Sequence, residues 1–149
     1  MGRDLDGFWR LTSGRHTADE LRYILEALLK VPAAGWGSIV CSVVPALTSP
    51  WSEALRAITG LVPIEMSAGN VSLRIDVTDP SSVGADRIAN AYAARALYGT
   101  PASVVDLGTA TTLDCVSKAG AYVGGAIAPG VVTASEELFR RAARLARVD

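Results

Sequence analysis

A glycine, an acid and an arginine stand together in residues 84–87, whose sequence is Gly-Ala-Asp-Arg. Gly84 permits close approach of the backbone to a ligand, and the Asp86 carboxylate can accept a proton from a hydroxyl nucleophile. The Arg87 guanidinium can bind an anion through two parallel hydrogen bonds. Such a base beside an alcohol, with cations holding the phosphates, is sufficient for phosphoryl transfer. An acid at a helix N-terminus is also common without any function, because the helix dipole favours it.

A second segment, residues 106–112, has the sequence Asp-Leu-Gly-Thr-Ala-Thr-Thr and follows an apolar run. A tight turn at Gly108 would point backbone amides and hydroxyl groups at one spot, and such concavities bind phosphate. Asp106 could hold a cation that neutralises the phosphate. The alternative is an ordinary hairpin whose threonines favour β structure, since glycines are common in turns.

Paired glycines mark a third segment, residues 124–130, with the sequence Gly-Gly-Ala-Ile-Ala-Pro-Gly. Within a strand they indicate that another backbone or a ligand comes close. A packed strand with a kinked end explains the pattern equally well. The single histidine, His16, precedes a predicted helix and is interpreted as a surface or capping residue, because no nucleophile pattern accompanies it.

These segments require a framework of alternating strands and helices, which predicts an α/β fold. Three consecutive strands between residues 102 and 128, joined by tight turns, predict a meander that follows a helix from Gly84 to Tyr98. The helix at 18–30 begins with a capping box at Thr17 and Glu20. The other predicted elements are strands at 8–12, 38–44, 61–66 and 73–77, a helix capped by Ser49, and a last helix opened by a capping box at 133–136.

The composition narrows the class of protein. Half of the 149 residues are hydrophobic and 19% are charged, which supports a packed core and argues against disorder. A net charge of -1 without a basic block speaks against a nucleic-acid surface, and no apolar run could span a bilayer. We therefore expect a cytoplasmic protein. Cys41 and Cys115 lie in apolar, strand-like runs without metal-ligand spacing and are predicted to be buried thiols.

In their order along nearly the whole chain, these segments resemble the type III pantothenate kinases. Each motif is weak by itself, and together in register they are specific. The matching segments are Trp9–Leu11, Thr17–Glu20, Ser42–Pro45, Asp79–Pro80, Val83–Ile88 with Asn90, Asp106–Thr112, Gly124–Gly130, and the residues Leu138, Phe139, Arg141, Ala142, Ala143 and Leu145.

The resemblance implies the ribonuclease-H-like (actin-like ATPase) fold of the acetate and sugar kinase/actin superfamily. Residues 1–100 would form most of the first domain, and residues 101–149 the opening strands and helix of the second. The implied activity is ATP-dependent phosphorylation of pantothenate to 4'-phosphopantothenate, the first step of coenzyme A biosynthesis. The implied partners are pantothenate and ATP, with no nucleic acid and no membrane, in a homodimer when full length.

The resemblance also implies residue roles. Asp86 matches the catalytic base, and Gly84, Ala85, Asp86 and Arg87 would line the pantothenate site. Gly108 and Thr109 match residues that contact ATP. Asp106 matches the metal-site residue that binds a monovalent cation, K⁺ or NH₄⁺. Mg²⁺ would accompany ATP. The geometric expectation is that the carboxylates of Asp86 and Asp106 converge on one cleft.

Three departures from the family pattern concern the ends and one pocket residue. The family opens with a strand carrying Asp-x-Gly-Asn-Thr, and this sequence lacks that motif. The family also continues well past the position of Val148, whereas this sequence stops at Asp149. Position 77 is valine where many relatives place a tyrosine that contacts substrate. We therefore expect a fragment with little or no kinase activity by itself. The alternatives are a non-catalytic regulatory protein of the same family and a kinase for a sugar or another small alcohol.

Overall fold

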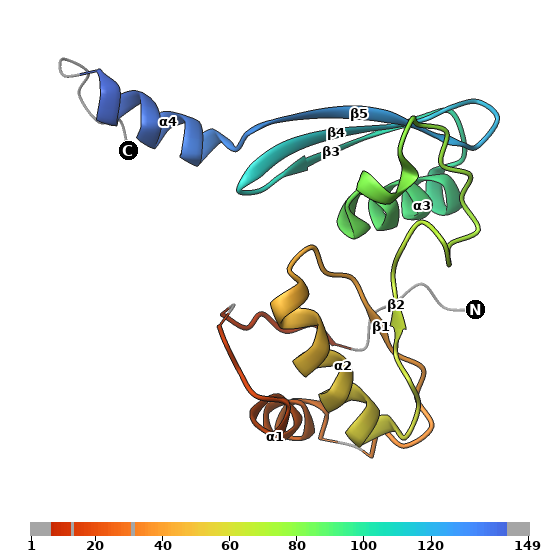
Figure 1. Cartoon of the computed structure of the whole chain (residues 1–149), viewed down its shortest axis with the longest axis vertical. Helices are drawn as coiled ribbons and strands as arrows, with labels where there is room; N and C mark the ends of the chain where they lie inside the picture. Colours follow the sequence, from red (N-terminus) through yellow and green to blue (C-terminus); the bar gives the residue numbers. More distant parts are fainter. Residues whose placement is uncertain (1–6, 13, 31, 143–149) are drawn as a thin grey trace. The chain divides into compact units, whose positions relative to one another are not determined.

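The computed structural model describes residues 7–142 except residues 13 and 31. It is a mixed α/β structure that divides into two compact units, Met1–Glu65 (unit 1) and Met66–Asp149 (unit 2) (Figure 1). The two domains expected from the resemblance, with their boundary at residue 100, stay a prediction. The predicted continuation of the last helix through Leu145 lies outside the described residues.

Unit 1 contains two helices and a short parallel sheet. Its elements are α1 (Ala18–Leu29), β1 (Ile39–Val40), α2 (Pro45–Thr59) and β2 (Ile64–Glu65). The predicted capping box of α1 is confirmed, because the Thr17 amide donates to Glu20 Oε2 at 2.7 Å and the Glu20 amide donates to Thr17 Oγ1 at 3.3 Å. The Thr17 amide and hydroxyl both donate to the Glu20 carboxylate, and these bonds lower the pKa of Glu20 below its ordinary value.

The start of α2 corrects the sequence prediction. The helix begins at Pro45, so Pro50 lies inside it and Ser49 is not its cap. Pro45 fits the first turn, where no amide partner is needed, and the Ser42 hydroxyl accepts a hydrogen bond from the Val44 amide at 3.1 Å. The predicted end is confirmed, because Gly60 closes α2 with φ of 75°.

The strands of unit 1 are shorter and more exposed than predicted. The runs 38–44 and 61–66 contribute only two residues each to β1 and β2, and residues 8–12 form no strand. Ile39 and Ile64, which are paired in register, are 63% and 54% exposed. Strand propensity depends on packing against neighbouring strands, which a two-stranded sheet supplies only in part. For the same reason Cys41 is exposed, against the prediction, while Cys115 is partly buried.

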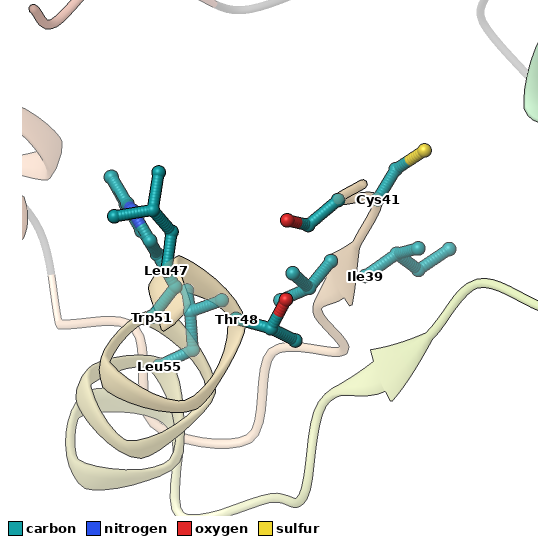
Figure 2. A pocket seen from close by; sticks show the side chains of 8 residues that line it. Ile39, Cys41, Leu47, Thr48, Trp51 and Leu55 are labelled. Atoms are coloured by element: carbon teal, nitrogen blue, oxygen red, sulfur yellow. The ribbon is translucent and has the colours of Figure 1, made fainter. Parts of the chain in front are cut away.

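Unit 1 also has an open cavity of about 440 Å³ between α2 and the strand region that includes β1. Figure 2 shows the side chains that line it, with Leu47, Thr48, Trp51 and Leu55 on α2 and Ile39 and Cys41 on the strand side. Its lining is mainly apolar, and it contains none of the residues that the sequence analysis assigned to chemistry.

Unit 2 contains the predicted meander. The elements of this unit are η1 (Pro80–Ser82), α3 (Ala85–Tyr98), β3 (Ala102–Leu107), β4 (Ala110–Val116), β5 (Tyr122–Pro129) and α4 (Val131–Arg141). The strand order β3-β4-β5 is antiparallel throughout, and α3 packs against β3 and β4. Tyr122 and Val116 join Leu73 and Ala91 in the buried core.

Two strand predictions in unit 2 need correction. Val105 and Leu107 are 59% and 71% exposed, so β3 is sheltered mainly on its α3 side and is not a fully buried strand. The predicted strand 73–77 is reduced to a single parallel bridge between Ile75 and Tyr122. The two backbone hydrogen bonds beside this bridge join Asp76 and Arg74 to Tyr122, each at 2.8 Å.

The last helix, α4, begins at Val131 and not at the predicted capping box. Thr133 is inside the helix, and its hydroxyl donates to the Thr109 carbonyl at 3.2 Å. The Gly130 amide donates to the same carbonyl at 2.9 Å. A Cβ at Gly130 would lie 2.1 Å from the Gly108 carbonyl oxygen, so only glycine permits this junction. In the part of the chain that the structure describes, no helix is both long and apolar enough to cross a membrane.

Candidate active site

The segment 84–87 forms the start of α3, as predicted. Gly84 is the N-cap residue, and its carbonyl accepts the first helical hydrogen bond from the Ile88 amide at 3.1 Å. Before it, Asp79 Oδ1 caps η1 by accepting from the Ser81 hydroxyl at 2.6 Å and the Ser81 amide at 3.0 Å. These bonds lower the pKa of Asp79, and they give the loop that leads into α3 a defined turn.

Asp86 is exposed in the first turn of α3, where its Oδ1 accepts from the Arg87 amide at 2.8 Å. Asn90 follows four residues later and therefore lies on the same side of the helix, about 6 Å further along its axis. The Asn90 side-chain amide donates to Asp106 Oδ2 at 3.2 Å. This bond joins the end of β3 to the helix face that carries Asp86.

The ATP-contact candidates lie at the turn that follows Asp106. Gly108 and Thr109 are both exposed and connect β3 to β4, and the Gly108 amide donates to the Ala110 carbonyl at 3.0 Å. The Thr109 carbonyl accepts from Gly130 and Thr133 at the beginning of α4. The turn thus lies beside a helix N-terminus, whose partial positive charge favours anions.

The Arg87 side chain packs against β4. Its Nε donates to Asp114 Oδ1 at 2.7 Å, and its Nη2 donates to the Leu113 carbonyl at 3.3 Å. The side chain is only 16% exposed. The Nε–Nη2 edge of the guanidinium is therefore bound to β4, and the binding of a substrate anion by Arg87 stays a prediction.

Asp114 is the residue that sequence reasoning missed. Its side chain is fully buried, and its Oδ1 also accepts a hydrogen bond from the Tyr122 hydroxyl at 2.9 Å. The other carboxylate oxygen, Oδ2, is buried and has no hydrogen-bond partner among the described residues. The available signal was an acid inside an apolar strand, between Leu113 and Cys115, since Asp is almost never fully buried unless it is paired.

Gly125, the second of the paired glycines in the third segment, makes room for this ion pair. Gly125 lies opposite Asp114 in the register of β4 and β5. A Cβ at Gly125 would be 1.7 Å from the Leu113 carbonyl oxygen and 2.8 Å from Arg87 Nη2. The close approach that the paired glycines indicated is therefore made by the backbone of β4 and the guanidinium of Arg87.

The buried hydroxyl of Tyr122 is expected to make the stability of the fold depend on pH. Burial, together with the hydrogen bond to the Asp114 carboxylate and its negative charge, raises the pKa of Tyr122 from 10.0 to about 12. The folded state holds the phenol proton of Tyr122 more tightly than the unfolded state does. The contribution of Tyr122 to the free energy of unfolding is therefore complete below pH 10 and declines as the pH rises to 12. The decline corresponds to roughly 2–3 kcal/mol.

Replacing Tyr122 with phenylalanine should remove this decline. We expect wild-type protein, but not Tyr122→Phe, to show a phenolate absorbance step near pH 12, and wild-type stability to fall between pH 10 and 12. Urea denaturation across this range measures the stability, and Tyr98→Phe, at a side chain that is 86% exposed, is the control. An unchanged step near pH 12 in Tyr122→Phe would contradict the assignment.

Comparison with known proteins identifies the family. Residues 2–149 match the family model described as type III pantothenate kinase. The chain belongs to the type III pantothenate kinase family. A type III pantothenate kinase of Moorella thermoacetica is 44% identical over 154 residues, covering 99% of this chain and 61% of the relative. The corresponding kinase of Thermobifida fusca is 43% identical, with 99% and 60% covered.

A kinase of the same description from Listeria innocua is 41% identical over 147 residues, covering 95% of this chain and 57% of the relative. The chain thus spans about 60% of the length of the curated type III pantothenate kinases that it matches. Among solved structures, a Baf family protein of Campylobacter jejuni, described as a transcriptional activator, matches with a TM-score of 0.51 and 21% identity. That match covers 83% of this chain and 53% of the solved chain, and it supports the fold alone.

Proposed function

We propose that this family member contributes to the ATP-dependent phosphorylation of pantothenate to 4'-phosphopantothenate, the first step of coenzyme A biosynthesis. The observation that carries the proposal is the hydrogen bond of 3.2 Å between Asn90 and Asp106. It brings the acidic end of β3 to the face of α3 that carries the exposed Asp86. A base for an alcohol and an acid for a phosphate-associated cation therefore lie on one side of unit 2.

In the proposed reaction, the primary hydroxyl oxygen of pantothenate attacks the terminal phosphorus of ATP. The new phosphorus–oxygen bond forms as the bond from phosphorus to the ADP oxygen breaks, and the hydroxyl proton passes to the Asp86 carboxylate. Gly84 and Ala85 line the pantothenate site with backbone and a small side chain. The exposed turn at Gly108 and Thr109 contacts the ATP phosphates, aided by the N-terminus of α4.

The residues around Asp106 fit a monovalent cation better than a divalent metal ion that is held by several protein side chains. Among the described residues, no three His, Cys, Asp or Glu side chains are grouped as a metal-binding set. Asp106 offers a single exposed carboxylate beside the oxygen-rich segment 109–112, which suits K⁺ or NH₄⁺. Mg²⁺ usually retains several waters and binds largely through the substrate phosphates, where it would neutralise charge on the transferred group.

Further parts of the proposal concern the whole protein. We propose the ribonuclease-H-like fold, with the first domain in residues 1–100 and the second beginning at residue 101. We also propose a cytoplasmic homodimer. These features are supported by membership in the type III pantothenate kinase family. Val77 packs against the core of unit 2 and adjoins Gly124, so the pantothenate pocket would differ here from relatives with tyrosine at this position.

A chimera tests the function independently of the length of the chain. Residues 2–149 would replace the matching region of the Moorella thermoacetica kinase, which is 44% identical. We expect pantothenate-dependent release of ADP, with 4'-phosphopantothenate identified by mass spectrometry. The parent kinase is the positive control, and a panel of sugars and small alcohols tests the substrate. A folded chimera that phosphorylates another alcohol, or no alcohol, would overturn the proposal.

A further inference from the structure

We propose that Asp114 is a positioning residue, which orients the first turn of α3 through Arg87 and thereby sets the place of the Asp86 carboxylate. The inference rests on the proposed function for its catalytic consequence, but its structural part stands on contacts within unit 2. Asp114 does not reach the exposed face that carries Asp86, so it would act only through the guanidinium.

The first step of the argument is the connection between Asp114 and Asp86. Arg87 directly follows Asp86 in α3, so the two residues are separated by about 1.5 Å along the helix axis. The Arg87 guanidinium is bound at two points on β4, to Asp114 at 2.7 Å and to the Leu113 carbonyl at 3.3 Å. Two bonds from one planar group fix its orientation as well as its distance. Movement of this group would therefore be transmitted to the turn that carries Asp86.

The second step is that three elements build the place for this guanidinium. β4 supplies Asp114, and β5 supplies the Tyr122 hydroxyl, which donates to the same Asp114 oxygen at 2.9 Å. The guanidinium carbon also lies 6.0 Å from the centre of the Tyr122 ring. Gly125 leaves the space into which Arg87 Nη2 extends. A charge in this position needs hydrogen-bond partners, because a buried charge without a partner is strongly unfavourable.

The third step separates positioning from simple stabilisation. A buried ion pair can often be replaced by apolar side chains without loss of stability. Apolar contacts do not fix the orientation of a group, whereas hydrogen bonds do. A catalytic carboxylate needs a fixed orientation, because a misplacement of about 1 Å can lower a rate about 100-fold. The other end of α3 has its own arginine anchor, in which Arg95 donates to the carbonyls of Gly120 at 3.2 Å and Ser72 at 2.7 Å. The two ends of the helix can therefore be perturbed separately.

Hydrogen exchange on the full chain tests the structural part. In Asp114→Ala we expect the amides of residues 88–91, which form the first hydrogen bonds of α3, to exchange about tenfold faster. Asp114→Asn should recover part of this protection, because its amide oxygen can still accept from Arg87 Nε. It also provides the measurement if the alanine variant does not fold. Arg95→Ala is the matched control and should affect residues 95–98 more than residues 88–91.

Two outcomes would overturn the structural part. One is unchanged protection at residues 88–91 in both Asp114 variants, and the other is an equal loss of protection along all of α3. The absorbance titration of Tyr122 gives an independent signature, since Asp114→Asn removes the negative charge beside the phenol. We expect the absorbance step near pH 12 to move to lower pH, and an unmoved step would contradict the contact.

Kinetics in the chimeric kinase test the catalytic part. We expect Asp114→Ala to lower kcat about 10- to 100-fold, with Asp114→Asn between it and the native residue, while KM for ATP stays unchanged because the ATP contacts come from the β3–β4 turn. An unchanged kcat would overturn the positioning role. An inactive chimera with native Asp114 would instead refute the proposed function, and the exchange measurements would still decide whether Asp114 orients α3.

Discussion

Alanine at position 125 is expected to destabilise unit 2 by more than about 3 kcal/mol and could prevent it from folding. The added Cβ would lie 1.7 Å from the oxygen and 2.8 Å from the carbon of the Leu113 carbonyl, well inside any permitted contact. These are backbone atoms of the adjacent strand, so β4 and β5 would have to separate. The same methyl group would meet Arg87 Nη2 at 2.8 Å and so disturb the ion pair with Asp114.

The two units allow this effect to be localised within one sample. All three tryptophans, Trp9, Trp36 and Trp51, lie in unit 1, so their fluorescence reports that unit. Hydrogen exchange in β3, β4 and β5 reports unit 2. We expect Gly125→Ala to abolish protection in these strands while the tryptophan signal of unit 1 persists.

Gly108→Ala is the matched control for the added methyl group. Its Cβ would meet no atom closer than the Ala110 carbonyl oxygen at 3.7 Å, which is an ordinary contact. Its stability should therefore change by no more than about 0.5 kcal/mol. If Gly125→Ala were as stable as Gly108→Ala, the close packing of β4 against β5 would be wrong.

Asparagine at position 86 is expected to lower pantothenate-dependent phosphoryl transfer by about 10²- to 10⁴-fold in the chimeric kinase. The change removes the proposed proton acceptor and keeps the size of the side chain. Asp86 is exposed, and its carboxylate accepts a hydrogen bond from the amide of the next residue, so folding should be preserved. The loss of a favourable charge at the start of α3 should cost at most about 1 kcal/mol of stability.

Asp19→Asn provides the control for that charge effect. Asp19 is the second residue of α1 as Asp86 is the second residue of α3, and each follows an alanine. Both variants should lose similar stability in urea denaturation, but only Asp86→Asn should lose transfer activity. Retained activity in Asp86→Asn would refute its role as the base.

Local patterns predicted much of the framework correctly. The capping box of α1, the glycines that close α2 and α3, the start of α3 at Gly84 and the antiparallel meander are all confirmed. Each depends on residues close in the chain, where side-chain capping, positive φ and tight turns act directly on the backbone. The predicted starts of α2 and α4 were wrong, because each helix begins upstream of the serine or threonine that was expected to cap it.

Burial and long-range contacts could not be predicted from local sequence patterns. The strand-like runs around Cys41 and Val105 were predicted to be buried, yet both residues are exposed, because burial depends on what covers a sheet face. The pairing of Arg87 with Asp114 joins residues 27 positions apart. It arises only when α3 packs on β4 and Gly125 leaves space for the guanidinium.

The amino-acid sequence thus specified which residues could perform phosphoryl chemistry and which local elements carry them. Folding in three dimensions assigned Arg87 to a buried partner and linked Asp106, through Asn90, to the helix face of Asp86. The physical reason is one of range. Capping and turn formation act over a few residues, whereas the pairing of a buried charge depends on every element packed around it.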